Sequence, residues 1–265
     1  MRKEEGLLES ALAHHFGQPG SRSRARLALR ASACLGLSRN DGLALATAVE
    51  LLHNASLVQD DLQDRSGERR GQAALWCSHG EHAALGVVDL LLGGAYRALA
   101  EVSAPPRLPP LLIRLQEAVA DTLRGQMHDL GGGANGQASV EEMLATAAGK
   151  SGPLFALGIE LPLLYAGYEA ALPRARAAAV DFGIGYQIVD DLADREEDRA
   201  AGRANLALAL ERSSGANAES AAKALAQRHL RAAAAGGRAL PCACGAHLGE
   251  LSDRLLTQLE ALGHD

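Results

Sequence analysis

The chain has 265 residues, 48% of them hydrophobic, which is enough for a sizeable core in one large domain or two small ones. Its 32 acidic and 26 basic residues give a net charge of −6, which excludes the general basic footprint of a nucleic-acid-binding protein. The opening stretch, MRKEEGLLESALAHH, lacks the apolar core of a signal peptide. The longest apolar run, at 87–92, is interrupted by Asp89, so we expect no membrane-spanning helix.

The cysteines form neither a disulfide framework nor a Cys-x-x-Cys pair; they are Cys34, Cys77, Cys242 and Cys244. Cys242 and Cys244 with His247 nearby amount to half of a metal site, and we interpret all four thiols as small buried or surface groups. This usage favours a reducing compartment, so we expect a cytoplasmic location.

Helical periodicity recurs along most of the chain, while β-branched residues are sparse and no strand or hairpin pattern is evident. The predicted helices span 5–16, 24–36, 41–64, 80–102, 109–130, 140–149, 153–168, 173–197, 217–234 and 245–262. Turn signals separate them at 18–20, 103–110, 131–136, 213–215 and 236–241. These breaks are too short for interdomain linkers. We therefore predict one all-α domain over 1–265, a helical bundle around a central cavity.

The helix predicted at 41–64 ends in an Asp-Asp-x-x-Asp motif. Asp60 and Asp64 are four residues apart, so they lie on one face of the helix. His53 shares this face, and Glu50 lies one turn earlier. Stacked carboxylates repel each other and imply a counterion, and oxygen-only ligands suit Mg2+ held together with substrate phosphates. Glu50 and His53 also match half of a di-iron site, which we reject because the second half is missing.

Two arginines, Arg69 and Arg70, follow this motif and precede Gly71. Paired guanidinium groups beside an acidic cluster suit bidentate phosphate binding, and we predict that role for both. Arg65 is interpreted as a solvated residue of the basic turn.

The helix predicted at 173–197 carries a second Asp-Asp-x-x-Asp motif, from Asp190 to Asp194. Phe182 and Tyr186 precede Asp190 on the same face at four-residue intervals. The rings either line an apolar cavity, shield a cation through their π faces, or form a core stripe. Two acidic clusters facing each other would form a pocket for metal ions and a polyphosphate group.

Two weaker features lie between the motifs. Gln126 and Asp129 are neighbours three residues apart near the end of the helix predicted at 109–130. Lys150 lies among small residues at 149–152, where a backbone could approach a phosphate.

In their order and spacing these landmarks resemble the trans-isoprenyl diphosphate synthases, or polyprenyl synthetases, from about residue 20 to 198. The landmarks are Glu50 and His53 before the first motif, Arg69-Arg70-Gly71, the segment Gly125 to Leu130, Lys150-Ser151, and Tyr186-Gln187 before the second motif. One Asp-Asp-x-x-Asp is weak in an acidic protein, whereas five ordered landmarks are specific. The resemblance implies the all-α isoprenoid synthase fold and a homodimer.

The resemblance also implies the reaction. Mg2+, as three ions with bound diphosphate, assists ionisation of an allylic prenyl diphosphate, and isopentenyl diphosphate attacks the resulting cation. The implied metal ligands are Asp60, Asp64, Asp190 and Asp194. The implied catalytic residues are Asp60, Asp61, Asp64, Lys150, Gln187, Asp190 and Asp191. The implied substrate-binding residues are Arg22, His53, Arg69, Arg70, Lys150, Tyr186 and Gln187.

Two segments depart from the family pattern. The family's opening Gly-Gly-Lys-Arg-x-Arg-Pro is altered here: Arg22 can stand for the lysine, and Ala25 falls where the last arginine belongs. Arg24 or Arg26 is a candidate to compensate, although on the helix both are predicted to point elsewhere. The second departure, at 199–205, replaces the family's Gly-Lys and later Lys-Thr. These changes concern isopentenyl diphosphate and leave ionisation of an allylic diphosphate intact.

Three functions stay open. The leading one is a chain-elongating prenyltransferase of the farnesyl or geranylgeranyl class, favoured by the retained His53 and Arg70. The second is a divergent enzyme that cyclises a prenyl diphosphate or passes it to another acceptor, which the 3% aromatic content opposes. The third is a non-catalytic partner subunit, which the paired acidic motifs oppose.

Product length is partly readable by the same resemblance. A bulky residue four or five positions before the first aspartate stops the growing chain in this family. Ala55 and Ser56 occupy those positions here and are small. They predict a product of geranylgeranyl length or longer, unless a large residue on a neighbouring helix closes the cavity.

Overall fold

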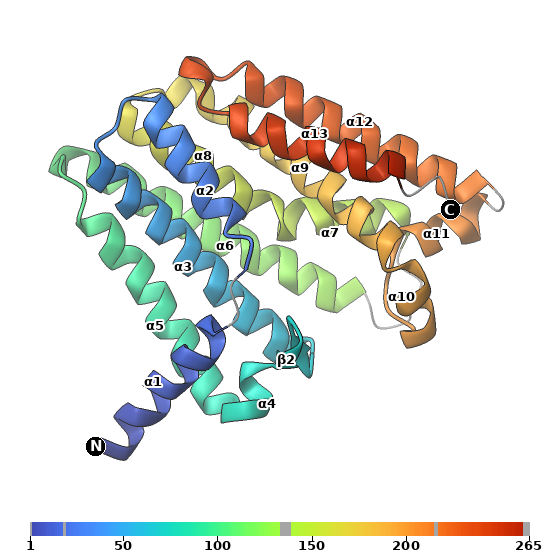
Figure 1. The fold of residues 1–265 in the computed structure, drawn as a ribbon, viewed down its shortest axis with the longest axis horizontal. Helices are drawn as coiled ribbons and strands as arrows, with labels where there is room; N and C mark the ends of the chain where they lie inside the picture. Colours follow the sequence, from blue (N-terminus) through green and yellow to red (C-terminus); the bar gives the residue numbers. More distant parts are fainter. Residues whose placement is uncertain (1, 18–19, 133–138, 215–216, 262–265) are drawn as a thin grey trace.

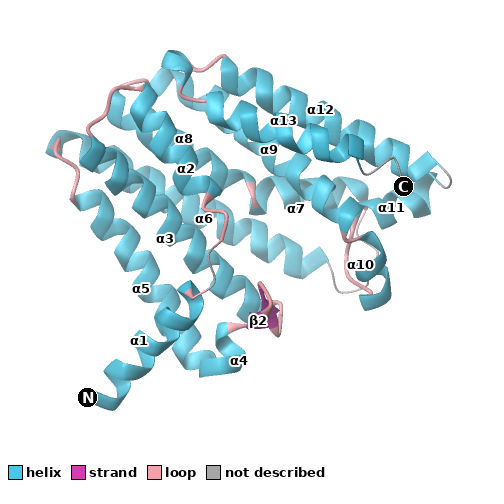
Figure 2. Ribbon diagram, in the orientation of Figure 1, coloured by secondary structure: helices cyan, strands magenta, loops and turns pink. Residues whose placement is uncertain are grey.

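The computed structural model describes residues 2–17, 20–132, 139–214 and 217–261, and these fold almost entirely into helices (Figures 1 and 2). The helices are α1 (Arg2–Phe16), α2 (Ser23–Cys34), α3 (Arg39–Gln63), α4 (Leu75–His79), α5 (Glu81–Ala100), α6 (Leu108–Gly132), α7 (Val140–Lys150), α8 (Gly152–Ala166), α9 (Leu172–Ala193), α10 (Arg195–Ala201), α11 (Leu206–Ser214), α12 (Ala218–Arg238) and α13 (Ala246–Ala261). The predicted all-α bundle is confirmed.

A β-hairpin between α3 and α4 was not predicted. It pairs β1 (Glu68–Arg69) with β2 (Gln72–Ala73) in antiparallel register. The residues at its tip, Arg70 and Gly71, have φ of 55° and 77°, the pattern of a type I′ hairpin turn. Strands this short show no alternation, and Arg-Gly is not among the strong sequence signals for this turn, so the pattern could not be recognised.

The C-terminal third also differs from the prediction. The helix expected at 173–197 is broken at Asp194, which separates α9 from α10. The short helix α11 follows a left-handed turn at Gly202 and is capped by the Asn205 side chain, which accepts from the Leu208 backbone N–H at 3.2 Å. The helix α12 continues past the glycines expected to end it, because Gly236 packs against α9, where a Cβ would lie 2.9 Å from Ala178 Cβ.

The start of α3 is anchored by buried polar contacts. The Ser38 hydroxyl accepts from the Asp41 backbone N–H at 3.1 Å and caps the helix. The buried Asp41 carboxylate accepts from Ser103 N at 2.7 Å, which ties α3 to the connection between α5 and α6. The 25-residue helix then runs through the bundle and carries the first acidic motif to its far end.

The helix α8 lies at the centre of the bundle and contacts α2, α3, α6 and α9. It is apolar on all sides, as a fully enclosed helix must be, and every residue from Leu154 to Leu164 is buried. Its charged exception is Glu160, which is 0% exposed and receives hydrogen bonds from Arg114 of α6 and Arg176 of α9. This ion triad joins the helices α6, α8 and α9.

One described helix, α5, is long and apolar enough to cross a membrane by length and composition. It packs lengthwise against α3, burying Val87 and Leu91 on that side, and Asp89 interrupts its apolar sequence. These contacts are those of a helix that belongs to the bundle. The absence of a membrane-spanning segment stays a prediction.

Replacing Glu160 by alanine should cost about 3 kcal/mol of unfolding free energy, because Arg114 then stays buried without its fully buried partner. Urea unfolding followed by circular dichroism measures this loss. The matched control is Glu169→Ala, which removes an exposed ion pair with Arg107 and should cost no more than about 0.5 kcal/mol. Equal losses in the two variants would contradict the inferred role of the triad.

Candidate active site

The first acidic motif meets two other helices at the end of α3. Asp64 accepts a hydrogen bond from Gln126 Nε2 of α6 at 2.9 Å, and Lys150 Nζ of α7 lies 3.6 Å from its second carboxylate oxygen. Asp60, one turn earlier, is half-buried beside them. The structure therefore brings together three residues that were predicted from separate landmarks.

Two glycines make this convergence possible. A Cβ at Gly125 would lie 2.5 Å from the Gly149 carbonyl carbon, so α6 and α7 touch backbone to backbone at this crossing. Gln126 and Lys150 are the residues that follow these glycines. The predicted landmark from Gly125 to Leu130 thus has a packing reason, although the side chain of Asp129 lies outside the described residues.

The environment of Asp60 disfavours its charged form. Burial, followed by repulsion from Asp64, raises the pKa of Asp60 to about 6, and the opposing effect of Lys150 does not compensate. A cation would relieve this strain. Among the described residues no three histidine, cysteine or acidic side chains converge as a complete metal site. Carboxylate oxygens are donors of the kind that Mg2+ prefers, and Mg2+ is often held by one or two carboxylates together with substrate phosphates.

Asp61, predicted as catalytic, faces the β-hairpin instead of this cluster. It is 3% exposed, and Arg69 Nε donates to both of its oxygens at 3.0 and 3.1 Å. This bidentate pair fixes Arg69 beside the motif. The side chain of the neighbouring Arg70 packs against the backbone of Gly20, where a Cβ would lie 2.4 Å from the Arg70 guanidinium.

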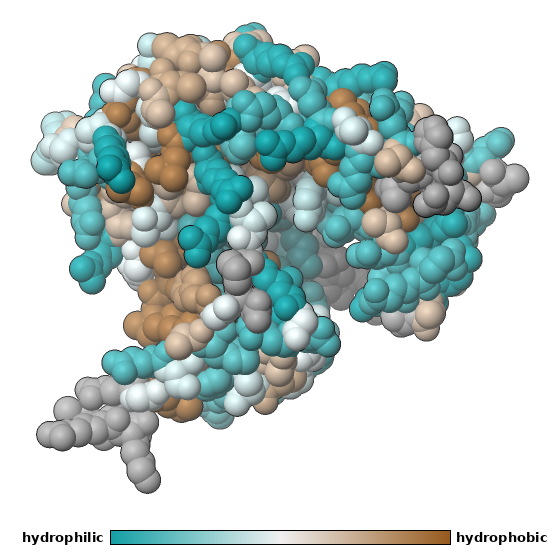
Figure 3. Space-filling view, viewed as in Figure 1, coloured by the Kyte–Doolittle hydropathy of each residue, from teal (hydrophilic) through white to brown (hydrophobic). Residues whose placement is uncertain are grey.

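The second motif ends α9 and separates into exposed and buried carboxylates. Asp190 and Asp194 are exposed at the end of the helix. Partial desolvation, followed by repulsion from Asp194 and Asp198, raises the pKa of Asp190. In space-filling view this face of the molecule is hollowed between the β-hairpin and α10 (Figure 3).

Asp191 is 7% exposed and is satisfied by protein donors. It accepts from the Leu206 backbone N–H at 2.8 Å and from Gln187 Nε2 at 2.7 Å. Burial raises its pKa to about 6 despite these bonds. The structure thus places both Asp191 and Gln187, predicted as catalytic, in a contact that holds α11 against α9.

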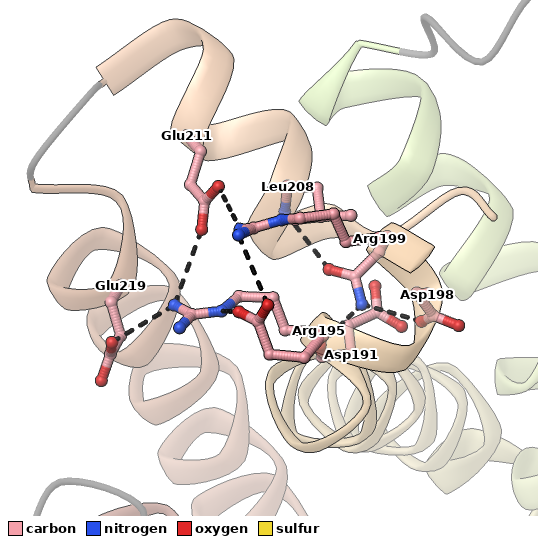
Figure 4. A network of polar contacts seen from close by, with 9 residues as sticks. Asp191, Arg195, Asp198, Arg199, Leu208, Glu211 and Glu219 are labelled. Carbon is pink, nitrogen blue, oxygen red and sulfur yellow. Dashed lines mark hydrogen bonds and ion pairs between the residues drawn. The ribbon is translucent and has the colours of Figure 1, made fainter. Parts of the chain in front are cut away.

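The segment that departs from the family pattern folds into a network of ion pairs (Figure 4). Asn205 Nδ2 donates to the Asp191 carbonyl at 2.6 Å and to the Asp198 carboxylate at 2.9 Å. Arg199 pairs with Glu211 of α11 at 2.6 Å, so α10 and α11 are held together. The altered residues have local partners, and the second motif keeps its support.

Arg24 lies beside His53, as the alternative that it compensates requires, and the expectation that it points elsewhere on the helix is wrong. Its Nη1 donates to His53 Nε2 at 3.1 Å, and its electrostatic neighbours include Glu50 and Tyr186. Burial lowers the pKa of Arg24 to about 10. Burial, followed by the positive charges of Arg24 and Arg70, lowers the pKa of His53 well below its usual value.

A one-residue shift in the reading of the opening motif could have found Arg24. If Ser21 takes the place of the family's lysine, Arg22 and Arg24 fall on its two arginines and Ala25 on its proline. Arg22, the predicted stand-in for the lysine, is exposed with φ of 49° at the start of α2.

The aromatic residues of α9 take different positions. Phe182 is 2% exposed and packs edge-on against Phe155 of α8, with ring centroids 4.7 Å apart, so it belongs to the core. Tyr186 is 40% exposed, and partial burial, followed by Asp190, raises its pKa. Sequence reasoning missed Phe155, because a lone aromatic residue in an apolar helix carries no pattern.

The two chain-length residues also separate. Ala55 is buried in an apolar cluster with Val87 and Leu91 of α5, so a neighbouring helix fills the space beside it. Ser56 is partly buried, and its hydroxyl donates to the His53 carbonyl at 2.8 Å. Product length stays a prediction that rests on Ser56 more than on Ala55.

Comparison with known proteins identifies the class. The family model of polyprenyl synthetases matches residues 5–205, and the chain belongs to this family. The (2E,6E)-farnesyl diphosphate synthase of Mycobacterium tuberculosis is 32% identical over 65% of this chain and 48% of its own length. Thus the chain spans about half the length of such curated relatives. The geranylgeranyl diphosphate synthase of Pantoea ananas is 30% identical over 74% of this chain and 67% of its own length.

Solved structures share the fold. The geranylgeranyl pyrophosphate synthetase of Pyrococcus horikoshii superposes with a TM-score of 0.86 at 22% identity, covering 97% of this chain and 91% of its own. An isoprenoid synthase family member from Thermotoga neapolitana gives a TM-score of 0.73 at 27% identity, covering 97% of this chain and 91% of its own.

Alanine substitution should affect mainly stability at Asp191 and mainly ligand binding at Asp190. Asp191→Ala leaves the Leu206 N–H and Gln187 without their acceptor and should cost about 1–3 kcal/mol of unfolding free energy. Asp190→Ala, at an exposed site under repulsion, should change stability by less than about 0.5 kcal/mol but abolish Mg2+-dependent binding of inorganic diphosphate. Urea unfolding and calorimetric titration separate the two effects. Similar destabilisation by both variants would contradict this division of roles.

Proposed function

We propose that this protein condenses an allylic prenyl diphosphate with isopentenyl diphosphate to a longer all-trans prenyl diphosphate. The observation that carries the proposal is the pairing of two different anion sites. Exposed or half-buried carboxylates lie at the ends of α3 and α9, while Arg24 of α2 donates to His53, two turns before Asp60 on α3, and supplies a separate positive charge. Such a pair suits two diphosphates, one ionised with metal ions and the other held intact.

Asp60 and Asp64 of α3, with Asp190 and Asp194 of α9, would hold Mg2+, as three ions once diphosphate is present. Bound Mg2+ supplies Lewis-acid stabilisation to the departing diphosphate. Lys150, next to Asp64, and Arg69, held by Asp61, add fixed positive charge to the same group. Asp191 and Gln187 keep α9 and α11 in place, and Tyr186 lies beside the allylic carbons.

Arg24, His53 and Arg70 would bind the diphosphate of isopentenyl diphosphate. His53 is neutral at pH 7 because its pKa lies well below its usual value. A guanidinium can only donate, so the bond from Arg24 to Nε2 leaves the ring proton on Nδ1. Nδ1 is buried and without a hydrogen-bond partner among the described residues, and it can donate to a ligand. Arg24 would supply a guanidinium to this second-substrate site in place of the arginine missing at Ala25, which supports the proposal.

We further propose a homodimer in the cytoplasm. Large apolar side chains are exposed on α5 and α6, where Leu85 is 53%, Leu90 49% and Ile113 60% exposed. An apolar face of this kind suits a second copy of the chain. The four cysteines are free, which suits a reducing compartment.

Product assays test the function. With Mg2+, each allylic diphosphate should give a longer diphosphate only when isopentenyl diphosphate is supplied, and mass spectrometry should show geranylgeranyl length or longer. Chelation of Mg2+ should stop the reaction, and Asp60→Asn should lower kcat roughly 100-fold or more. A hydrocarbon or free diphosphate formed from the allylic substrate alone would favour the cyclase or other-acceptor alternative. No turnover by the folded protein would favour the partner-subunit alternative.

A further inference from the structure

The guanidinium of Arg24 stacks on the aromatic ring of Phe155. Its guanidinium carbon lies 4.0 Å from the centroid of the Phe155 ring, within the range of a cation–π interaction. Phe155 comes from α8, Arg24 from α2, and His53, the hydrogen-bond partner of Arg24, from α3. Through these two contacts Arg24 links three helices at the site.

The charge of Arg24 has few other sources of stabilisation. Its hydrogen-bond partner is a neutral imidazole, and Glu50 acts on it as a more distant charge. Among the described residues, Arg24 Nε has no hydrogen-bond acceptor. A desolvated guanidinium without a bonded carboxylate is costly, so the π face of Phe155 offsets part of the cost before any anion arrives.

The orientation of the Phe155 ring is itself fixed by packing. Phe155 is 2% exposed, and Phe182 meets it edge-on at 77° between ring planes. Tyr186 is a further neighbour, with its ring centroid 6.4 Å from that of Phe155. Three of the chain's seven phenylalanine and tyrosine side chains gather here, although the chain is only 3% aromatic. Of these three rings, that of Phe155 lies under the Arg24 guanidinium, and the other two pack around it.

We propose that Phe155 is a positioning residue whose ring holds the Arg24 guanidinium in place and thereby sets the affinity for isopentenyl diphosphate. This inference rests on the proposed function, in which Arg24 and His53 bind that diphosphate. The ring acts through Arg24, and among the described residues it shows no contact with the aspartates of either motif. Tyr186 also lies near the ring but is carried by α9, so the main effect should fall on the substrate that Arg24 binds.

The test compares Phe155→Leu with the wild type. Loss of the π face should weaken calorimetric binding of isopentenyl diphosphate roughly tenfold and raise its KM by a similar factor. The KM for the allylic diphosphate and kcat should change by less than about twofold. Phe155→Tyr keeps the aromatic face and should retain wild-type affinity within about threefold. Phe155→Met replaces the leucine variant if that variant is unstable.

Two controls separate positioning from packing. Leu157→Val removes a comparable volume from α8 in the other core cluster and should leave both KM values unchanged. In a double-mutant cycle, Phe155→Leu should add little to the loss caused by Arg24→Lys, because lysine lacks the planar group that stacks.

Additive losses, or equal changes in both KM values, would overturn the role of Phe155. So would a Phe155→Leu variant that binds isopentenyl diphosphate as tightly as the wild type. Failure of the proposed function shows itself separately, as a folded wild-type protein that forms no longer diphosphate under any of the assay conditions.

Discussion

Repulsion among carboxylates gathered at the ends of two helices is the constraint on which the rest of this site depends. In each motif the structure separates a buried, hydrogen-bonded carboxylate from carboxylates that are more exposed. Asp61 and Asp191 are buried and satisfied by Arg69 and by the Leu206 N–H, respectively. Among the described residues, Asp60 and Asp190 accept no such hydrogen bonds, and burial with repulsion raises the pKa of both. Burial raises the pKa of Asp191 as well, despite its bonds. The uncompensated carboxylates are the ones available to a divalent cation, so the same arrangement that strains the free protein prepares it for a metal-bound diphosphate.

Two of the opposing cations, Lys150 and Arg24, are placed by contacts that carry no charge. Lys150 reaches Asp64 because Gly125 and Gly149 let α6 and α7 touch. Arg24 is held by an aromatic ring and a neutral histidine. Rigid helices position these groups before any substrate arrives, which is the condition for electrostatic stabilisation of a leaving group.

The helices that follow residue 205, where the match to the family model ends, pack against the helix that carries the second motif. Residues after 205 include α12, which packs along the length of α9. At Gly185, a Cβ would lie 2.7 Å from the Leu230 side chain, so α12 presses on α9 directly before Tyr186. The network around Asn205 and Asp191 continues this support to the end of α9. The segments that depart most from the family pattern thus hold the second motif through their own local partners.

Much of this could be predicted because it is local. Four-residue spacing places Asp60 with Asp64 on one helix face, and helical periodicity with turn signals yields an all-α bundle whose main helices agree within a few residues. The hairpin at Arg70 and the break at Asp194 escaped, because a short strand or a kink leaves no periodic trace.

Charge and spacing in the sequence by themselves determined the two acidic motifs and the chemistry they suit, and the resemblance to a known family implied the class of protein. Only the tertiary structure decided that Arg24 enters the site, that Asp61 and Asp191 serve as anchors, and that Phe155 lies under a guanidinium. The reason is physical: spacing along one helix fixes which residues share a face. Which faces meet, and which polar atoms are left without partners, depends on packing between segments far apart in the chain.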